Sequence, residues 1–183
     1  MFEKLFGDTV ELLLQGDLGI TEVEETGCNF TENALLKARH AAQQSGMPAL
    51  ADDSGIEVDA LDGAPGVYSA RYAGSHASAA DNIAKLLQDM QGVPVKSRSA
   101  RFRCVLSYIR SADDPAPLIA AGVWEGSIAE RPSGQEGFGY DPIFIDRSSG
   151  KCAAELAPAI KNACSHRGKA LAALSKELRT TGL

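Results

Sequence analysis

The chain has 183 residues, 44% hydrophobic and 23% charged, which predicts one globular domain and argues against a disordered chain. Its formal net charge of −6 argues against a nucleic-acid polymer as partner, because binding to a phosphate backbone needs a basic surface. The longest strongly apolar stretch, residues 117–124, is too short to cross a membrane, and residues 1–8 lack the apolar core of a signal peptide.

The first predicted elements lie in the N-terminal part of the chain. Residues 9–14 have the apolar run of a short strand. A helix is predicted after the favourable cap Asn29, because alanines and leucines recur at helical spacing up to Gly46, a natural C-terminal stop. A short strand over residues 48–51 follows, and the sequence Asp-Asp-Ser-Gly at 52–55 predicts a sharp turn.

The rest of the chain alternates between helical and strand patterns. Apolar residues at helical spacing predict an amphipathic helix over residues 81–90. Residues 101–109 and 118–128 have the pattern of long strands, and the turn residues between them predict a β-hairpin. Ser165 is a good cap for a last helix, so we expect an α/β domain with a mixed sheet. The remaining predicted segments are a loop over residues 62–74 and a glycine-rich loop over residues 133–142.

Two groups of carboxylates could take part in chemistry. Asp52 and Asp53 follow a predicted strand, where side chains alternate between faces, so we expect one of them to face a given cleft. Such a carboxylate can bind Mg²⁺ or accept a proton from water, and the alternative is a solvated turn. Glu22, Glu24 and Glu25 are either a solvated face or, together with the first group, a site for one hard cation.

Basic residues gather near the C-terminus. His166 and Arg167 fall in the first turn of the last predicted helix, where the helix dipole disfavours positive charge, and this suggests an anion or a base edge as partner. Arg167 offers a planar fork to a pair of acceptors, and Lys161 lies just upstream. The alternative is that His166 and Arg167 lie on a solvent-exposed helix cap. Lys37, in the first predicted helix, is likewise either a functional residue or an exposed lysine.

Two aromatic residues, Phe138 and Tyr140, lie in the glycine-rich loop. An aromatic ring in such a loop can stack on a nucleotide base. The alternative is that both rings pin the loop to the hydrophobic core. The sequence alone leaves both interpretations open.

The four cysteines are scattered and form no Cys-x-x-Cys pair. This spacing is typical neither of a disulfide framework nor of a zinc site. We therefore expect reduced thiols and a cytoplasmic protein.

Six short stretches, in the same order along the chain, resemble the inosine triphosphate pyrophosphatase family. Each stretch alone is weakly specific, but six in order, over nearly the whole chain, are highly specific. The stretches are Glu24-Glu-Thr-Gly27, Glu32-Asn-Ala-Leu-Leu-Lys-Ala38, Ala51-Asp-Asp-Ser-Gly55, Gly63-Ala-Pro-Gly-Val-Tyr-Ser-Ala-Arg-Tyr72, Gly137-Phe-Gly-Tyr-Asp-Pro-Ile-Phe144 and Ser165-His-Arg-Gly168.

The resemblance implies a fold, a reaction and a set of site residues. The fold is an elongated mixed sheet flanked by helices, with a cleft between two lobes, in a homodimer. The reaction is hydrolysis of the purine nucleotides ITP, dITP and XTP to the monophosphate and pyrophosphate, with Mg²⁺ as cofactor. Asp53 is implied as the general base and a metal-associated carboxylate, and Glu25 as a metal ligand. The residues implied to contact substrate are Lys37, Ser54, Phe138, Gly139, Tyr140, Asp141, Lys161, His166 and Arg167.

The start of the chain departs from the family pattern. The family begins with a strand and a Thr/Ser-Gly/Asn-Asn-x-x-Lys loop around the triphosphate, whereas residues 1–8 resemble the latter part of the helix that follows this loop. We therefore expect a single pyrophosphatase domain, residues 1–183, with an incomplete N-terminus. The explanations are a misassigned start codon, which we favour, a truncation, or a naturally short relative.

Loss of the phosphate loop predicts weak triphosphate binding and low turnover. The alternative function is therefore a catalytically weak relative that binds nucleotide. A phosphatase or a Maf-like nucleotide hydrolase is a third possibility, which the identity of the product would distinguish.

Overall fold

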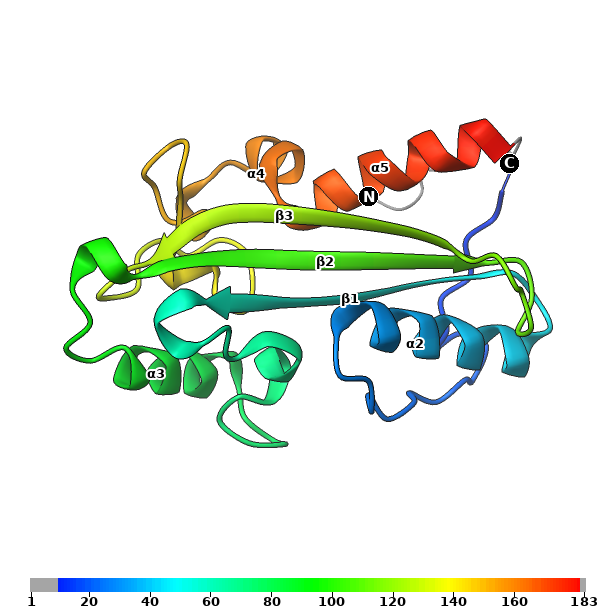
Figure 1. Ribbon diagram of the computed structural model, residues 1–183, viewed down its shortest axis with the longest axis horizontal. Helices are drawn as coiled ribbons and strands as arrows, with labels where there is room; N and C mark the ends of the chain where they lie inside the picture. Colours follow the sequence, from blue (N-terminus) through cyan, green and yellow to red (C-terminus); the bar gives the residue numbers. More distant parts are fainter. Residues whose placement is uncertain (1–9, 182–183) are drawn as a thin grey trace. The chain divides into compact units, whose positions relative to one another are not determined.

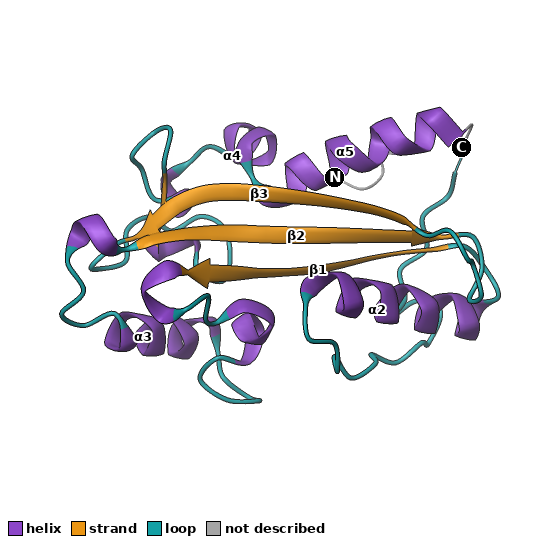
Figure 2. Cartoon of the chain, viewed as in Figure 1, coloured by secondary structure: helices purple, strands orange, loops and turns teal. Residues whose placement is uncertain are grey.

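The computed structural model describes residues 10–181, which form helices and a four-stranded sheet (Figure 1, Figure 2). These elements are α2 (Phe30–Ser45), β1 (Ala49–Val58), α3 (Ala79–Asp89), β2 (Ser99–Ile109), β3 (Leu118–Ile128), β4 (Phe144–Asp146), α4 (Pro158–Cys164) and α5 (His166–Thr181). The strand order is β1-β2-β3-β4, and the arrows of the three long strands alternate in direction (Figure 1). β4 pairs antiparallel with β3. The α/β class and the hairpin of β2 and β3 predicted from the sequence are confirmed.

Contacts within the chain divide it into two compact units. Unit 1 consists of Met1–Asp53, Cys104–Gly122 and Arg167–Leu183, and it holds α2, nearly all of α5 and one part of each long strand. Unit 2 consists of Ser54–Arg103 and Val123–His166, and it holds α3, α4, β4 and the other parts of those strands.

In unit 1 the sheet has a helix on each face (Figure 1). Leu174 of α5 belongs to one hydrophobic cluster with residues of β2 and β3, and Ala38 of α2 belongs to a second cluster. β1 contributes side chains to both clusters, because side chains alternate between the faces of a strand. Leu50 packs against the α5 cluster, and Ala51 packs against the α2 cluster. This alternation fixes where the next two residues of β1 point.

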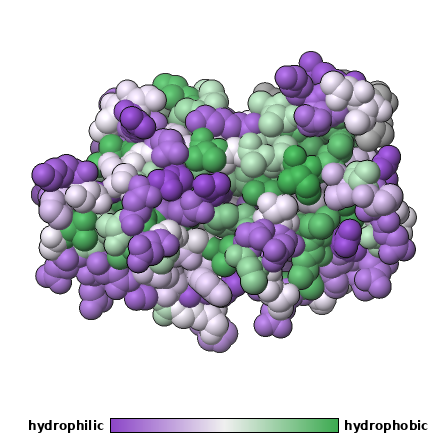
Figure 3. Space-filling model, in the orientation of Figure 1, coloured by the Kyte–Doolittle hydropathy of each residue, from purple (hydrophilic) through white to green (hydrophobic). Residues whose placement is uncertain are grey.

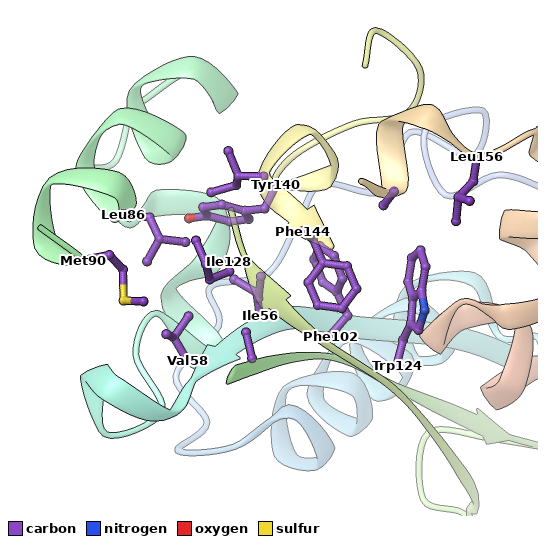
Figure 4. Close-up of a cluster of buried hydrophobic side chains, with 13 residues drawn as sticks. Ile56, Val58, Leu86, Met90, Phe102, Trp124, Ile128, Tyr140, Phe144 and Leu156 are labelled. Atoms are coloured by element: carbon purple, nitrogen blue, oxygen red, sulfur yellow. The ribbon is translucent and has the colours of Figure 1, made fainter. Parts of the chain in front are cut away.

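Unit 2 has its own core, which contains a group of aromatic rings (Figure 4). The ring centroids of Phe102 and Phe144 are 4.6 Å apart, and those of Trp124 and Phe144 are 5.0 Å apart. The indole Nε1 of Trp124 donates a hydrogen bond of 2.8 Å to Asp146. This bond satisfies the one polar atom of a ring that is otherwise buried in an apolar environment.

The helix predicted after Asn29 is confirmed, with both of its ends. The Asn29 side chain accepts a hydrogen bond of 2.9 Å from the Glu32 backbone amide. Gly46 ends the helix with φ of +70°, a conformation in which glycine has no side chain to strain. The last helix begins directly after Ser165, as expected.

Two local predictions are wrong. Residues 52–55 do not turn, since β1 continues through them to Val58. Their turn-forming composition is overridden because Ile56 and Val58 beyond them are fully buried and the strand must extend to place them. Residues 10–14, the described part of the strand predicted over 9–14, form no strand and expose their leucine side chains.

Two elements were not predicted, β4 and α4. A three-residue strand is too short to show alternation, and α4 has only seven residues. The helix expected over residues 1–8 and the first residue of the predicted strand, Thr9, lie outside the described residues.

The face shown in Figure 3 has hydrophilic and hydrophobic residues interspersed. Within residues 10–181, no helix is both long enough and apolar enough to span a membrane.

Candidate active site

Asp52 and Asp53 are adjacent in β1 and are bonded on opposite faces of the sheet. Asp53 lies on the same face as Ala51, two residues earlier, and is bonded to Lys37 of α2. Asp52 lies on the same face as Leu50, two residues earlier, and is bonded to Arg167 at the start of α5. The sequence-based expectation that only one of the two carboxylates faces a given side is therefore confirmed.

The first group of site residues centres on the Lys37 ammonium. Its Nζ donates to Asp53 Oδ1 at 2.7 Å and to Glu25 Oε1 at 2.9 Å. The Asp53 side chain is only 7% exposed, whereas those of Lys37 and Glu25 are 25% exposed. The structure thus brings together three residues that the sequence had implied in separate stretches, with the aspartate deepest.

Asn33 is a fourth member of this group, which the sequence analysis did not identify. It is fully buried, and its amide Nδ2 donates to Asp53 Oδ2 at 3.3 Å. Its carbonyl oxygen accepts a hydrogen bond of 2.8 Å from the backbone amide of Gly27. Asn33 and Lys37 are four residues apart, and this spacing places both on one face of a helix. An asparagine on the apolar face of the helix, four residues before Lys37, is the sequence signal that could have identified Asn33 as a site residue.

The approach of the chain to Asn33 explains the glycine at position 27. A Cβ on Gly27 would lie 2.6 Å from Asn33 Oδ1 and 2.7 Å from Glu32 Cβ. Both distances are well below van der Waals contact. Glycine therefore lets the segment that carries Glu25 pass close to α2.

The charges in this group are set by burial and by pairing. Burial raises the pKa of Asp53, and the hydrogen bond from Lys37 offsets this only in part. Burial disfavours the charged form of Lys37, but the hydrogen bonds to Asp53 and Glu25 outweigh it and raise the pKa of the lysine. The lysine stays charged, and Asp53 becomes a stronger base than an exposed aspartate.

Glu25 and Asp53 are the residues of this group whose chemistry would suit a magnesium ion. Both present hard oxygen donors, and both already direct an oxygen at one positive group, the Lys37 ammonium. Among residues 10–181 no cluster of three or more His, Cys, Asp or Glu side chains is arranged to hold a metal. Two carboxylates are nevertheless sufficient for Mg²⁺, which usually completes its shell with water and substrate phosphate oxygens.

Arg167 is held on the opposite face of the sheet, within unit 1. Its Nη2 donates to Asp52 Oδ2 at 2.6 Å, and its side chain also contacts the thiol of Cys104. Burial disfavours the guanidinium charge, but the Asp52 carboxylate outweighs it and raises the pKa of Arg167. The arginine is therefore a fixed positive group whose side chain is 27% exposed.

The second group of site residues lies in unit 2, around the glycine-rich loop. Lys161 of α4 forms an ion pair with Asp141, and its Nζ lies 4.9 Å from the centroid of the Phe138 ring. Asp141 also accepts a hydrogen bond of 2.7 Å from the Phe138 backbone amide. Gly137 has φ of +88°, and a Cβ there would collide with the Asp141 carboxylate and the Lys161 ammonium. The loop is thus folded around an ion pair whose carboxylate is buried and whose ammonium is partly buried.

The two aromatic residues of the loop have different environments. Phe138 is 63% exposed, whereas Tyr140 is 5% exposed and belongs to the core of unit 2. The Tyr140 hydroxyl donates to the carbonyl oxygen of Ser69 at 2.8 Å, and the Ser69 hydroxyl accepts from the Ile56 amide at 2.9 Å. Tyr140 therefore pins the loop to the core, and Phe138 is the ring available for stacking. Sequence reasoning missed Ser69, although it lies in one of the six family stretches.

The remaining residues of the implied site are placed as follows. His166 is 5% exposed and stacks on Phe102, with ring centroids 4.8 Å apart. Ser54 is half-buried in β1, and Gly139 follows Phe138 with φ of +58°. The structure gathers Glu25, Lys37 and Asp53 in unit 1, and Phe138, Asp141 and Lys161 in unit 2.

Comparisons with known proteins place the chain in one family. A family model described as the Ham1 family matches residues 2–177. A dITP/XTP pyrophosphatase of Methylococcus capsulatus is 59% identical over 169 residues, which cover 92% of this chain and 84% of the relative. A protein of the same name from Xanthomonas oryzae is 55% identical over 98% of this chain and 90% of the relative.

Solved structures give the same result. A HAM1 protein from Coxiella burnetii matches with a TM-score of 0.92 and 50% identity, covering 98% of this chain and 91% of that chain. The Staphylococcus aureus Ham1 protein matches with a TM-score of 0.89 and 39% identity, covering 98% of this chain and 92% of that chain. The family resemblance of the sequence is confirmed, and the chain belongs to the Ham1 family.

Proposed function

We propose that this protein hydrolyses dITP, XTP and ITP to the nucleoside monophosphate and pyrophosphate. The observation that carries the proposal is the identity of 55–59% to relatives named dITP/XTP pyrophosphatase over more than nine-tenths of the chain. The group formed by Asp53, Lys37 and Glu25 supports it, because it supplies a base and a cation site together. A reaction of this kind would remove abnormal purine nucleotides from the nucleotide pool.

Asp53 is the proposed general base. Its carboxylate accepts a proton from the attacking water while the water oxygen bonds to a phosphorus of the triphosphate and the anhydride bond to pyrophosphate breaks. Its burial supports this role, because a raised pKa makes the carboxylate more basic. Asn33 and Lys37 each bond one of its oxygens and thereby fix its orientation.

Glu25 and Asp53 are the proposed ligands of Mg²⁺. The ion, when bound, would neutralise charge on the phosphate oxygens and orient them. Lys37 is proposed to contact the phosphates, and its hydrogen bonds keep it charged for that purpose. Lys37 would thus exchange part of its bonding with Glu25 and Asp53 for bonding with the substrate.

Base recognition is proposed to rest on a stacking ring and on donors. In unit 2, the exposed Phe138 ring is suited to stack on a purine, and Lys161 is a donor beside it. Arg167, which has donors and no acceptor, suits the 6-keto oxygen of hypoxanthine or xanthine and would leave the adenine amino group unpaired. The other residues proposed to shape substrate binding are Ser54, Gly139, Tyr140, Asp141 and His166.

Two further proposals concern the state of the protein. We propose that it works as a homodimer, as the family resemblance implies. We also propose a cytoplasmic location, which is supported by four cysteines that form no disulfide among the described residues. Sedimentation of the purified chain, which should show twice the monomer mass, tests the first proposal.

The test of the proposed reaction is pyrophosphate release from ITP, dITP, XTP and ATP by this 183-residue chain, with and without Mg²⁺. We expect release from the first three substrates, little from ATP, and loss of release when the ion is chelated. Orthophosphate in place of pyrophosphate would contradict the proposal and favour a phosphatase. Equal rates with ATP would contradict the proposed base recognition.

A further inference from the structure

Asp52 has a contact that the proposed chemistry does not use. It lies beside the proposed general base in β1, on the opposite face of the sheet from the group around Lys37. It pairs with Arg167, 115 residues further along the chain, at 2.6 Å within unit 1. Both side chains are partly exposed, 29% for Asp52 and 27% for Arg167.

We propose that Asp52 is a positioning residue for nucleotide binding, which holds the Arg167 guanidinium in the orientation that donates to the purine 6-keto oxygen. This inference rests on the proposed function, in which Arg167 contacts the nucleotide. Asp52 itself touches no substrate. It acts through the arginine, while Asp53 serves the reaction on the other face of the sheet.

The geometry favours orientation over stability as the purpose of this pair. Ion pairs between partly exposed groups contribute little to stability, because water and salt screen them. A carboxylate bound to one Nη atom does, however, fix the rotation of a planar guanidinium whose long side chain otherwise samples many rotamers. A fixed orientation of the guanidinium matters when the ligand offers one acceptor at a defined position, as the purine 6-keto oxygen does.

The position of Asp52 is also fixed independently of Arg167. β1 is held by sheet pairing, and Leu50 packs into the α5 cluster two residues earlier. The carboxylate is therefore anchored by a strand, while the arginine lies at the first turn of a helix. This is the arrangement expected when the aspartate orients the arginine.

The test is a double-mutant cycle on the binding of inosine monophosphate, measured by calorimetry with the full chain. The variants are Asp52→Ala, Arg167→Ala and the double variant, with Asp52→Asn as a smaller change. We expect Asp52→Ala to weaken binding about tenfold, a change of the size found when a charged hydrogen-bond partner is lost. In the Arg167→Ala background, the same substitution should have almost no further effect. The preference for the inosine over the adenosine monophosphate should fall in parallel.

Asp89→Asn is the matched control. Asp89 is 28% exposed, pairs with Lys85 at 2.9 Å, and lies outside the proposed site. It should leave nucleotide binding unchanged, and the melting temperatures of all variants should stay close to that of the unmodified chain. A merely structural role for Asp52 predicts a lower melting temperature and no change in the preference between the two nucleotides.

Three results would overturn the proposal. The first is that Asp52→Ala binds inosine monophosphate as tightly as the unmodified chain does. The second is that this substitution weakens binding equally with and without Arg167. The third is that the unmodified chain does not prefer the inosine over the adenosine nucleotide. The proposed reaction fails separately, since binding is measured on the product. If the chain binds the monophosphate but releases no pyrophosphate, the proposed reaction is contradicted. The double-mutant cycle on binding still tests the role of Asp52 in that case.

Discussion

Asp52 and Asp53 are consecutive residues that bond to different helices across the sheet. Asp53 Oδ1 accepts from Lys37 of α2 at 2.7 Å, and Asp52 Oδ2 accepts from Arg167 of α5 at 2.6 Å. The two carboxylates can therefore have different tasks although nothing separates them in the chain. Their environments also differ, because Asp53 is 7% exposed and Asp52 is 29% exposed.

Replacing Asp53 by asparagine is expected to abolish most of the turnover. The variant keeps the shape of the side chain but cannot accept a proton from water, and removal of a general base typically costs about 10²- to 10⁴-fold in rate. The measurement is kcat for pyrophosphate release from ITP. Asp17→Asn, at an exposed position that is not among the proposed site residues, is the control. Turnover within a few-fold of the unmodified chain would show that another group activates the water.

Replacing Phe138 by alanine is expected to raise KM for every purine substrate without lowering stability. Its ring is 63% exposed and contributes to binding by stacking, a contact worth about 1–3 kcal/mol per base. Ile160→Ala removes a side chain that is 59% exposed in the same unit and should change neither quantity. A clear fall in melting temperature for Phe138→Ala would mean that the ring supports the loop instead.

Tyr140→Phe is expected to give the opposite pattern, a loss of stability with a smaller effect on binding. Burial raises the pKa of Tyr140, so its hydroxyl remains protonated and donates to the Ser69 carbonyl oxygen. Removing the hydroxyl deletes this buried hydrogen bond, at a cost of about 0.5–1.5 kcal/mol in free energy of unfolding. Urea denaturation measures this cost. An unchanged free energy of unfolding would show that the hydrogen bond is not needed to hold the loop.

Asp114→Asn is expected to lower stability in a pH-dependent way. The Asp114 carboxylate accepts hydrogen bonds of 2.8–2.9 Å from the Arg110 side chain and from the Arg110 and Ala116 backbone amides. The Arg110 side chain and these backbone amides hold the pKa of Asp114 below its ordinary value of 3.8. Because the folded-state pKa is lowered, the stabilisation is present above that ordinary value and is lost as the pH falls towards the folded-state pKa.

The measurement for Asp114 is the free energy of unfolding at about pH 7, 5 and 3 for the variant and the unmodified chain. The difference between them should be similar at the two higher values and smaller at the lowest. Asp113→Asn, one residue earlier in the same turn, is the control. A difference that persists unchanged at the lowest value would contradict the ionic origin of the effect.

Much of the local structure could be predicted from the sequence, because local signals and tertiary packing agree there. The helix between Asn29 and Gly46 has a cap, a periodic apolar face and a stop, and each of these depends on neighbours within a few residues. The turn predicted at residues 52–55 failed for the opposite reason. Its composition is that of a turn, but burial of Ile56 beyond it favours continued pairing in the sheet.

The sequence by itself determined the family and the residue types of the site. Six stretches in a fixed order sufficed to imply Glu25, Lys37 and Asp53, and alternation along a strand separated Asp52 from Asp53. Only the tertiary structure decided which groups meet. Asn33 reaches Asp53, Arg167 reaches Asp52, and Tyr140 is anchored to Ser69 in the core. These pairs are 20, 115 and 71 residues apart, and at such separations contacts are set by the packing of helices on a sheet, which no local pattern records.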